Sequence, residues 1–433
     1  MFLLTLFCFL LYFFTSIIFQ VFGFSWKPFD RINLIADLFP RHELSEDAAR
    51  KTLVVKVKPQ QDFELYKQGN LITNFYKNDS AVLPNFLEKL QKLKNGEKIK
   101  IRIAYFGDSM IEGDLLTQTL RKALQNEYGG SGVGYIPIYS NVSSFRQTAS
   151  CKSSGWEDVS FKTKGATNLY FSGHRFSGSG SGTYTDRSIE DSLVKIQKAL
   201  IFGQTSGISI DVNGTSITLE GNDLVNRHIL ANDLSHSISL KARSSKNLYG
   251  LSFESESGIF VDNFSFRGIT GVELKKLDED FIKSIQKANH YDLIVFQYGV
   301  NLLFRPNDTD YSYYVKMMSP VLKKFKQSLP DAEFLIVSSA DRAFRYNDEY
   351  KSAIGLPNLL ESQAKLALDN GFAFYNQFAT MGGTNSIVKW ATENPPLANK
   401  DYVHPNAKGA DILGEKLFEA IQKEYKKYNN RKH

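Results

Sequence analysis

The feature that most limits the possible folds is an interruption in a regular alternation of helix and strand patterns. Leucines at helical spacing over about residues 83–93 precede the apolar run IKIRIAYF at 99–106, and a second helical pattern covers about 112–127. Between about 138 and 260 the helical patterns stop, and Gly, Ser and Thr accompany short alternating runs. Alternating strands and helices form parallel sheets covered on both faces, so the sequence predicts an α/β domain split by a β-rich insertion.

The alternation resumes after the insertion. The later segments predict strands at DLIVFQY (292–298), EFLIVSS (333–339) and FAFYN (372–376), and helices at about 311–327, 357–369 and 406–424. Inside the insertion, ISIDV and TSITL flank Asn213-Gly214, which predicts a two-residue hairpin because both turn positions need a positive φ. SISLKA and LYGLSFES predict further strands, and short strands at regular intervals indicate a β-sandwich.

These patterns divide the chain into consecutive parts. The predicted parts are a hydrophobic leader over 1–26, an N-terminal arm over 27–82, the α/β domain in two pieces over 83–137 and 261–425, the inserted β-sandwich over 138–260, and a basic tail over 426–433. Within the arm, LVVKVK at 53–58 predicts a short strand.

The leader determines the expected compartment. Residues 1–26 contain no charged side chain, and an apolar run near 20 residues long can cross a bilayer. Val21 and Gly23 fit a signal-peptide cleavage site, but no Lys or Arg precedes the run, which favours a retained membrane anchor over a cleaved signal peptide. In either case we expect the body of the protein to be exported, to the periplasm or the cell envelope.

Charge and cysteine usage exclude several classes of protein. The chain has 52 Lys plus Arg and 46 Asp plus Glu, and part of the net +6 lies in the C-terminal tail, so a nucleic-acid partner is not indicated. Cys8 and Cys151 are the two cysteines, which is too few for a disulfide framework or a cysteine zinc site. We expect neither a metal nor a cofactor.

Residues that follow the predicted strands are the candidates for chemistry, because ligands in such sheets bind beyond the carboxyl ends of the strands. Gly107-Asp108-Ser109 follows the strand at 99–106, and Gly299-Val300-Asn301 follows the strand at 292–298. A serine on a tight strand-to-helix turn exposes its hydroxyl and holds its own N–H near a positive helix N-terminus. Asn301 offers an amide N–H to a tetrahedral intermediate.

A base for this serine is available near the C-terminus. His404 precedes the last predicted helix, and Asp401 stands three residues earlier. Asp401 can fix the imidazole tautomer while His404 takes the proton of Ser109, which predicts an acyl-enzyme mechanism. Each piece alone also has a structural explanation: Gly-Asp-Ser marks many turns, and Asp401 with His404 could cap a helix that has Pro405 at its first position.

Taken together, these motifs resemble those of the SGNH (GDSL-type) hydrolase superfamily. IRIAYFGDSMIEGDLLTQTLRKALQNEYGGSGVGYI, GIFVDNFSFRGITG, ATMGGTNSIVKWA and DYVHPNAKG are similar to segments of bacterial peptidoglycan O-acetylesterases, over roughly residues 83–422. The resemblance implies a flavodoxin-like three-layer α/β/α hydrolase domain. It also implies an inserted β-sandwich that resembles a carbohydrate-binding module.

The resemblance also implies roles for individual residues. Ser109, His404 and Asp401 would be catalytic, and Asp108 and Gly299 would support them. Gly268, with Gly271 as the alternative, would complete an oxyanion hole together with the Ser109 N–H and Asn301.

The leading hypothesis is an exported serine esterase that removes O-acetyl groups from a cell-envelope polysaccharide, with peptidoglycan as one candidate. An O-acetyltransferase with the same triad and a non-catalytic glycan-binding surface protein are the alternatives. The expected partners are the O-acetylated polysaccharide and, if the leader is retained, a membrane. In the insertion, Tyr170, Phe171 and Tyr184 are either sugar platforms or core residues.

Overall fold

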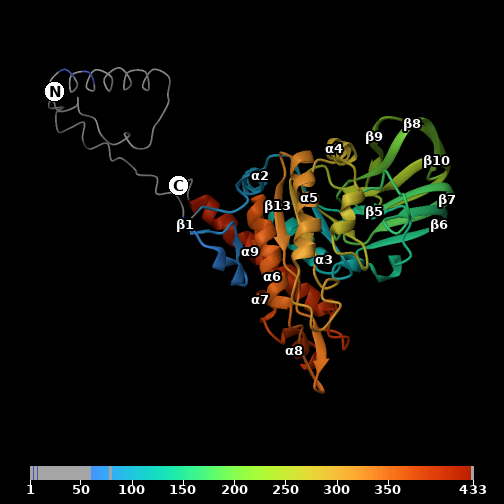
Figure 1. Ribbon diagram of the computed structural model, residues 1–433. Helices are drawn as coiled ribbons and strands as arrows, with labels where there is room; N and C mark the ends of the chain where they lie inside the picture. The colour runs from blue at the N-terminus through green and yellow to red at the C-terminus, as the bar shows by residue number, and fades with distance from the viewer. Residues whose placement is uncertain (1–2, 4–6, 8–59, 78–79, 431–433) are drawn as a thin grey trace. The chain divides into compact units, whose positions relative to one another are not determined.

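The computed structural model describes residues 3, 7, 60–77 and 80–430 (Figure 1). The described residues from 60 onward belong to one compact unit. The prediction of a leader over 1–26 and that of a strand at 53–58 fall outside the described residues. Within the described part of the chain, no helix combines the length and the apolar character needed to cross a bilayer.

A six-stranded sheet forms the centre of the α/β domain. Its strands, in spatial order, are β11 (Gly258–Ser265), β4 (Lys100–Gly107), β12 (Leu293–Gln297), β13 (Glu333–Val337), β16 (Ala373–Tyr375) and β2 (Ile72–Thr73). The first five strands are parallel, and β2 pairs antiparallel with β16. Numbered along the chain, the parallel strands have the order 2-1-3-4-5, which is the flavodoxin-like arrangement.

Helices cover both faces of this sheet. The helices are α2 (Pro84–Lys94), α3 (Thr117–Tyr128) and α9 (Ala407–Asn430) on one face, and α4 (Glu279–Ala288), α5 (Ser312–Ser328) and α6 (Leu356–Asn370) on the other. Side chains of β4 alternate between the two cores, since Ile103 and Tyr105 pack with the first group of helices and Phe106 with the second. The predicted α/β layers are therefore present.

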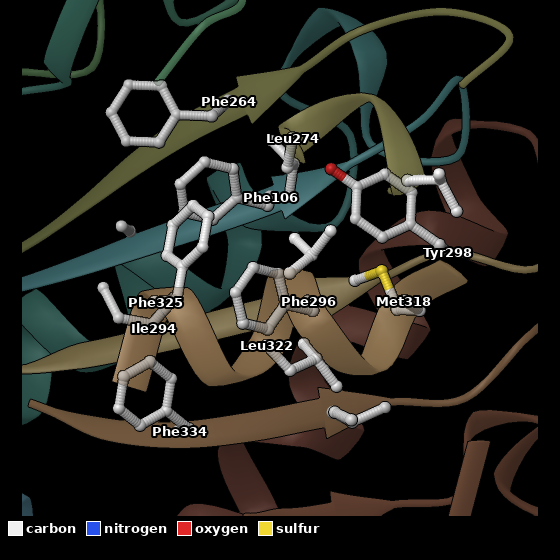
Figure 2. Close-up of a cluster of buried hydrophobic side chains, with 14 of the residues drawn as sticks. Phe106, Phe264, Leu274, Ile294, Phe296, Tyr298, Met318, Leu322, Phe325 and Phe334 are labelled. Atoms are coloured by element: carbon white, nitrogen blue, oxygen red, sulfur yellow. The ribbon is translucent and has the colours of Figure 1, made fainter. Parts of the chain in front are cut away.

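The second core is strongly aromatic. Figure 2 shows Phe106 of β4 and Phe296 of β12 facing Phe325 of α5. The ring centroids of Phe106 and Phe325 lie 5.6 Å apart in an edge-to-face arrangement, which is a favoured geometry for aromatic pairs. This packing fixes α5 against the two strands whose carboxyl ends carry the candidate site.

The remaining short elements lie around this domain. They are α7 (Gln377–Met381), α8 (Ser386–Thr392), the strand pair β1 (Gln60–Gln61) and β3 (Tyr76–Lys77), the hairpin β14 (Ala343–Tyr346) and β15 (Glu349–Ser352), and 3-10 turns at Phe63–Lys67, Glu112–Asp114, Ser143–Phe145 and Val272–Lys276.

Two predicted helix boundaries were wrong. The helix predicted from 112 begins only at Thr117, because Gly113, Asp114 and Leu116 have φ values of 72°, 70° and 62°, which a right-handed helix cannot contain. The last helix continues to Asn430, past the predicted end at 424. No Gly or Pro interrupts it there, and the ring of Tyr425 packs on Tyr128 with centroids 5.3 Å apart.

The insertion consists of six antiparallel strands that differ in length. They are β5 (Gly134–Pro137), β6 (Ala149–Ser160), β7 (His174–Asp186), β8 (Ile196–Val212), β9 (Thr215–Asp233) and β10 (Ser237–Glu254), in the order β6-β7-β10-β8-β9 with β5 also paired to β10. Asn213 and Gly214 join β8 to β9 with φ values of 49° and 86°, which confirms the predicted hairpin. The strands form one hydrogen-bonded network, so these pairings do not by themselves establish a two-sheet sandwich.

The sequence patterns misplaced some strands of the insertion. SISLKA and LYGLSFES are the two ends of the single strand β10, which has a register shift between Ser244 and Leu248. The antiparallel network already begins at Gly134, before the predicted start at 138. At its other end, β11 begins at Gly258 and belongs to the parallel sheet. Its nearly continuous burial is typical of a strand covered on both faces.

The three aromatic side chains singled out in the insertion are core residues. Tyr170, Phe171 and Tyr184 are at most 1% exposed. Tyr170 and Phe171 belong to the same apolar cluster as the α4, α5 and α6 side chains, whereas Tyr184 lies in the separate core of the insertion. They therefore join the insertion to the α/β domain or stabilise it from within, and do not present a sugar platform.

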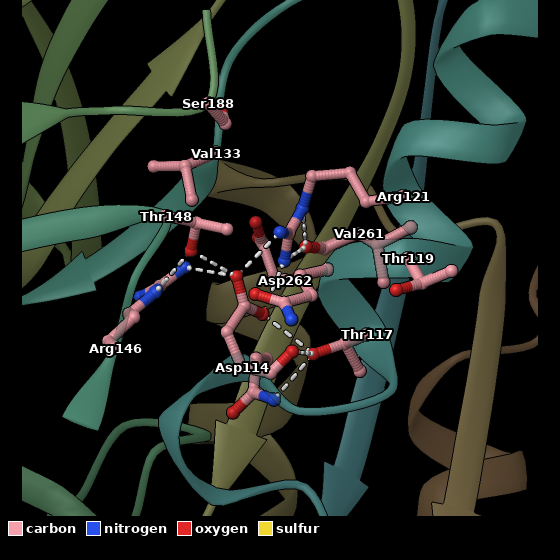
Figure 3. Close-up of polar contacts among 12 residues, drawn as sticks. Asp114, Thr117, Thr119, Arg121, Val133, Arg146, Thr148, Ser188, Val261 and Asp262 are labelled. Carbon is pink, nitrogen blue, oxygen red and sulfur yellow. Dashed lines mark hydrogen bonds and ion pairs between the residues drawn. The ribbon is translucent and has the colours of Figure 1, made fainter. Parts of the chain in front are cut away.

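A buried charged cluster also joins the two parts (Figure 3). The Asp114 carboxylate accepts two hydrogen bonds from Arg121, at 2.6 and 2.8 Å, and one from Arg146 of the insertion at 3.4 Å. The Thr148 hydroxyl donates to it as well. Burial acts to raise the pKa of Asp114, but Arg121 and Arg146 outweigh it and hold the pKa well below its usual range. Asp114 therefore stays ionised and ties the segment after β4 to the insertion.

Candidate active site

The candidate nucleophile lies on a tight turn at the end of β4. A Cβ atom at Gly107 would lie 2.8 Å from the Ile111 side chain, so a larger residue at the last position of the strand would displace Ile111. The Asp108 carboxylate accepts a hydrogen bond from the Met110 N–H at 2.9 Å, which closes the turn. Ser109 stands between them, at the edge where β4 and β12 end and where the strand order reverses.

His404 reaches Ser109 from the far end of the sequence. The Oγ atom of Ser109 and the Nε2 atom of His404 are 2.9 Å apart, although 295 positions separate the two residues. The Nδ1 atom of His404 lies 2.7 Å from the Oδ2 atom of Asp401. The three side chains that the sequence singled out therefore form one hydrogen-bonded series.

Asp401 is held in place by its own loop. Its Oδ1 atom accepts hydrogen bonds from the N–H groups of Val403, at 2.9 Å, and His404, at 3.1 Å. Partial burial acts to raise the pKa of Asp401, but the hydrogen bonds from the His404 side chain and from these two N–H groups lower it overall. An ionised carboxylate can only accept, so Nδ1 carries the proton and Nε2 is free to accept the hydroxyl proton of Ser109.

The hairpin β14–β15 supports the loop that carries Asp401 and His404. Tyr402 in this loop has a φ of 55°, and its C=O accepts a hydrogen bond from the Ala343 N–H at 3.0 Å. The ring of Tyr402 stacks on Tyr350 with centroids 4.0 Å apart. Arg342 donates a hydrogen bond to the C=O of Val300 at 2.7 Å. Its positive charge also interacts with the carboxylate of Asp401. Sequence reasoning missed these contacts because they join segments that are far apart in the sequence and share no hydrophobic pattern.

Asn301 bridges two of the predicted motif blocks. Its side-chain N–H groups donate to the Oδ2 atom of Asp108, at 3.1 Å, and to the C=O of Ile269, at 2.9 Å. Both N–H groups are therefore bonded within the protein. To donate to a tetrahedral intermediate, Asn301 would have to exchange the bond to Ile269 for one to the substrate.

The glycines of the candidate site differ in their surroundings. Gly268 is exposed with a φ of 83°, and a Cβ atom there would meet nothing within 4 Å. At Gly271 a Cβ atom would lie 2.7 Å from the Tyr298 ring, and at Gly299 it would lie 2.3 Å from the Ser339 side chain. Packing thus explains Gly271 and Gly299, whereas Gly268 is open and precedes Ile269, whose C=O contacts Asn301.

Sequence reasoning also missed an ion pair beside Gly268. Arg267 forms a bidentate contact with the Glu112 carboxylate, with one N–H···O distance of 2.9 Å. Glu112 follows the candidate nucleophile Ser109 by three positions, so this pair joins the turn of Ser109 to the loop of Gly268. The sequence feature that could have indicated this ion pair is the charge of Arg267, directly before the candidate oxyanion glycine.

Asp108 has an unusual environment for a carboxyl group. Its side chain is fully buried, and burial raises the pKa of Asp108 to about 7, although hydrogen bonds from Met110 and Asn301 act in the opposite direction. The carboxyl group therefore binds its proton more tightly in the folded protein than in the unfolded chain. Between about pH 4 and pH 7 stability should fall as the pH rises, because the folded state binds more protons over that window.

The variant Asp108→Asn tests this titration, since the amide cannot ionise. We expect the unfolding free energy of the wild type, relative to that of the variant, to fall by about 2 to 3 kcal/mol from about pH 5 to about pH 8. Urea unfolding of both proteins across this range measures the difference. A difference that stays constant with pH would show that Asp108 titrates normally.

Among the residues that the structure describes, no group of three or more His, Cys, Asp or Glu side chains is placed to hold a metal ion.

Comparisons with known proteins agree with this architecture. No protein-family model and no curated protein matches the sequence. Among solved structures, the chain is similar to one described as "Peptidoglycan O-acetylesterase in action, 5 min", with a TM-score of 0.68 and 23% identity over 82% of this chain and 99% of the other. At this identity the similarity establishes the fold. The predicted resemblance to peptidoglycan O-acetylesterases is thus confirmed for the fold.

Two further structures have lower scores. An acetyl xylan esterase matches 38% of this chain and 80% of its own, with 15% identity and a TM-score of 0.28. A family two carbohydrate esterase from Cellvibrio japonicus matches 64% of this chain and 99% of its own, with 10% identity and a TM-score of 0.27. Neither TM-score is high enough to carry an argument about this protein.

Proposed function

We propose that the protein is an exported serine esterase that removes O-acetyl groups from a cell-envelope polysaccharide, with peptidoglycan as the candidate polymer. The observation that carries the proposal is the hydrogen-bonded series of Ser109, His404 and Asp401 at the carboxyl edge of the parallel sheet. The similarity to a structure described as a peptidoglycan O-acetylesterase supports the choice of polymer. The uncharged segment over 1–26 supports export and, if it is retained, attachment to a membrane.

In the proposed mechanism, Ser109 Oγ attacks the acetyl carbonyl carbon while His404 Nε2 takes the hydroxyl proton. Asp401 stabilises the imidazolium that forms. The tetrahedral intermediate then collapses, the sugar oxygen leaves with the proton from His404, and the acetyl group remains on Ser109. His404 then takes a proton from a water molecule that attacks the acetyl carbon. The Oγ–C bond breaks, acetate leaves, and His404 returns the proton to Ser109 Oγ. No redox or metal step is required by this sequence of reactions.

The oxyanion of each tetrahedral intermediate needs donors. We propose the N–H groups of Ser109 and Gly268 and the side chain of Asn301 for this role, with Asp108 and Gly299 as supports of their loops. The hydrogen bond from Asn301 to Asp108 supports this assignment, because it holds the amide beside the nucleophile turn. We further propose that the insertion corresponds to the β-sandwich that resembles a carbohydrate-binding module in this family.

Mass spectrometry of O-acetylated muropeptides before and after incubation with the purified protein tests the function. We expect loss of the acetyl mass and release of acetate, and we expect neither with Ser109→Ala. An unchanged acetyl content would contradict the choice of peptidoglycan. Formation of newly acetylated glycan in excess of free acetate, when an acetyl donor is supplied, would indicate a transferase instead.

Asp401→Asn tests the part that the carboxylate plays. The amide keeps the size of the side chain but no longer favours the imidazolium or the Nδ1–H tautomer, so we expect kcat for acetyl esters to fall by at least about 10²-fold. This loss should be smaller than that caused by replacing Ser109. Steady-state kinetics with p-nitrophenyl acetate measures it, and a kcat within a factor of about three of the wild type would remove Asp401 from the triad.

A further inference from the structure

Arg342 lies directly before the hairpin strand β14, beside two loops of the candidate site. Its Nη1 atom donates a hydrogen bond to the C=O of Val300 at 2.7 Å. The N–H of the next residue, Ala343, donates to the C=O of Tyr402 at 3.0 Å. Arg342 and its neighbour therefore link the loop that follows β12 to the loop that carries the candidate base.

The C=O that Arg342 contacts belongs to the peptide unit that joins Val300 to Asn301. A peptide unit is planar, so a hydrogen bond that fixes its C=O also restricts the orientation of the residue that follows. The same turn is closed by the N–H of Leu302, which donates to the C=O of Gly299 at 2.8 Å. The direction of the Asn301 side chain, the proposed oxyanion donor, thus depends on Arg342.

Arg342 also acts on the candidate triad through its charge. Burial lowers the pKa of Arg342, and the carboxylate of Asp401 acts in the opposite direction. The Cζ atom of Arg342 lies 4.8 Å from the centroid of the Phe344 ring, and a cation over an aromatic face is attracted to it. Phe344 therefore restrains the guanidinium, and a positive charge in this place favours the ionised form of Asp401.

Stability alone does not account for an arginine at this position. Among the described residues, the buried Nε atom of Arg342 has no hydrogen-bond partner. A buried donor without a partner costs free energy, and an apolar side chain would avoid that cost. Such exceptions in a folded protein need a reason, and they are expected at functional sites. A part in the reaction supplies the reason here.

We propose that Arg342 is a positioning residue of the esterase reaction, which holds Asn301 and the loop of Asp401 and His404 in their relative positions. The inference rests on the proposed function, because it assigns Arg342 a part in the same reaction. Arg342 acts through Asn301 and Asp401 rather than on the ester itself. Both charges that form during the reaction, the oxyanion and the imidazolium, depend on groups that Arg342 holds.

Steady-state kinetics with p-nitrophenyl acetate test the proposal, because this ester needs no glycan. For Arg342→Ala we expect kcat to fall about 10- to 100-fold and KM to change by less than about threefold, since both charges form only in the transition state. Arg345→Ala is the matched control, because Arg345 lies on the same hairpin and pairs with Asp348 at the surface. An unchanged kcat in Arg342→Ala, or an equal loss in Arg345→Ala, would overturn the proposal.

Chemical rescue separates positioning from a role in folding alone. Ethylguanidinium replaces the atoms that Arg342→Ala removes, so we expect it to raise kcat of the folded variant by at least about fivefold. Arg342→Lys keeps the charge and a donor, and we expect its kcat to stay within about fivefold of the wild type. A loss that neither ethylguanidinium nor lysine restores would overturn the proposal. If Arg342→Ala does not fold, Arg342→Gln takes its place, and a kcat equal to that of Arg342→Lys would overturn the proposal.

Hydrogen exchange distinguishes a failure of this proposal from a failure of the proposed function. The exchange of the Asn301 side-chain N–H groups with water, followed by NMR without substrate, needs no turnover. We expect this exchange to be at least about tenfold faster in Arg342→Ala than in the wild type, because Asn301 is held less firmly. Equal exchange rates would overturn the role of Arg342 even if the esterase activity is present. Faster exchange in a protein that hydrolyses no ester would support the link between Arg342 and Asn301 and contradict the proposed function instead.

Discussion

Ser109→Ala is expected to lower kcat for acetyl-ester hydrolysis by about 10³-fold or more, and His404→Ala by a similar factor. The hydroxyl of Ser109 and the imidazole of His404 lie 2.9 Å apart, so His404 can take the hydroxyl proton. Neither group supports this step without the other. Members of a triad act as a unit, and removal of one leaves only the catalysis that binding and the oxyanion donors supply. The double variant should therefore be about as impaired as either single variant.

Steady-state kinetics with p-nitrophenyl acetate and with acetylated glycan measure this loss. Ser338→Ala is a suitable control, because Ser338 is a buried serine at the carboxyl end of β13 that bonds Asn376 and backbone groups. Near-normal rates in folded Ser109→Ala or His404→Ala would contradict the assignment of the triad. Losses that multiply in the double variant would show that the two residues act separately.

Asp114→Asn is expected to destabilise the fold by about 3 to 5 kcal/mol, which is the usual cost of leaving one member of a buried ion pair without its partner. Arg121 is 1% exposed and gives Asp114 two of its hydrogen bonds, so water cannot replace the lost carboxylate. Asparagine tolerates the positive φ of 70° at this position, so the variant changes the charge and keeps the backbone.

The matched control is an exposed ion pair that also links α3 to the insertion. Lys122 and Glu190 lie 2.7 Å apart, but their side chains are 64% and 76% exposed. We therefore expect Glu190→Gln to change the unfolding free energy by less than about 1 kcal/mol. Urea unfolding of both variants gives the comparison. Equal losses in the two would contradict the conclusion that the buried cluster of Asp114, Arg121 and Arg146 stabilises the boundary between the insertion and the α/β domain.

The sequence predicted the layers and the candidate triad for the same reason. Period and polarity are local properties, so the strands around 99–106 and 292–298 and the helical pattern after the first of them could be identified without knowing their partners. The helix α4 (Glu279–Ala288) was missed. Parallel strands place their carboxyl ends at one edge of the sheet, so Ser109 and Asn301 could be predicted to lie close together. The Asp401-Tyr402-Val403-His404 loop was found because its two side chains are close in sequence.

Features that depend on long-range contacts could not be predicted. The helix after β4 starts late because Asp114 has a positive φ and its carboxylate bonds Arg121 and Arg146. The spacing of apolar residues does not indicate such a backbone conformation. The two halves of β10 look like separate strands because the intervening polar residues break the alternation. In the same way, both N–H groups of Asn301 find partners that only the folded chain brings near.

Labelling with a fluorophosphonate, followed by mass spectrometry of the peptides, tests the central claim most directly. The reagent forms a stable bond with a serine only when a neighbouring base raises the nucleophilicity of its hydroxyl. We predict one modified residue, Ser109, in the wild type, and a labelling rate reduced by at least about 10²-fold in His404→Ala. An unlabelled Ser109 in the folded wild type, or equal labelling rates in the two proteins, would contradict the account.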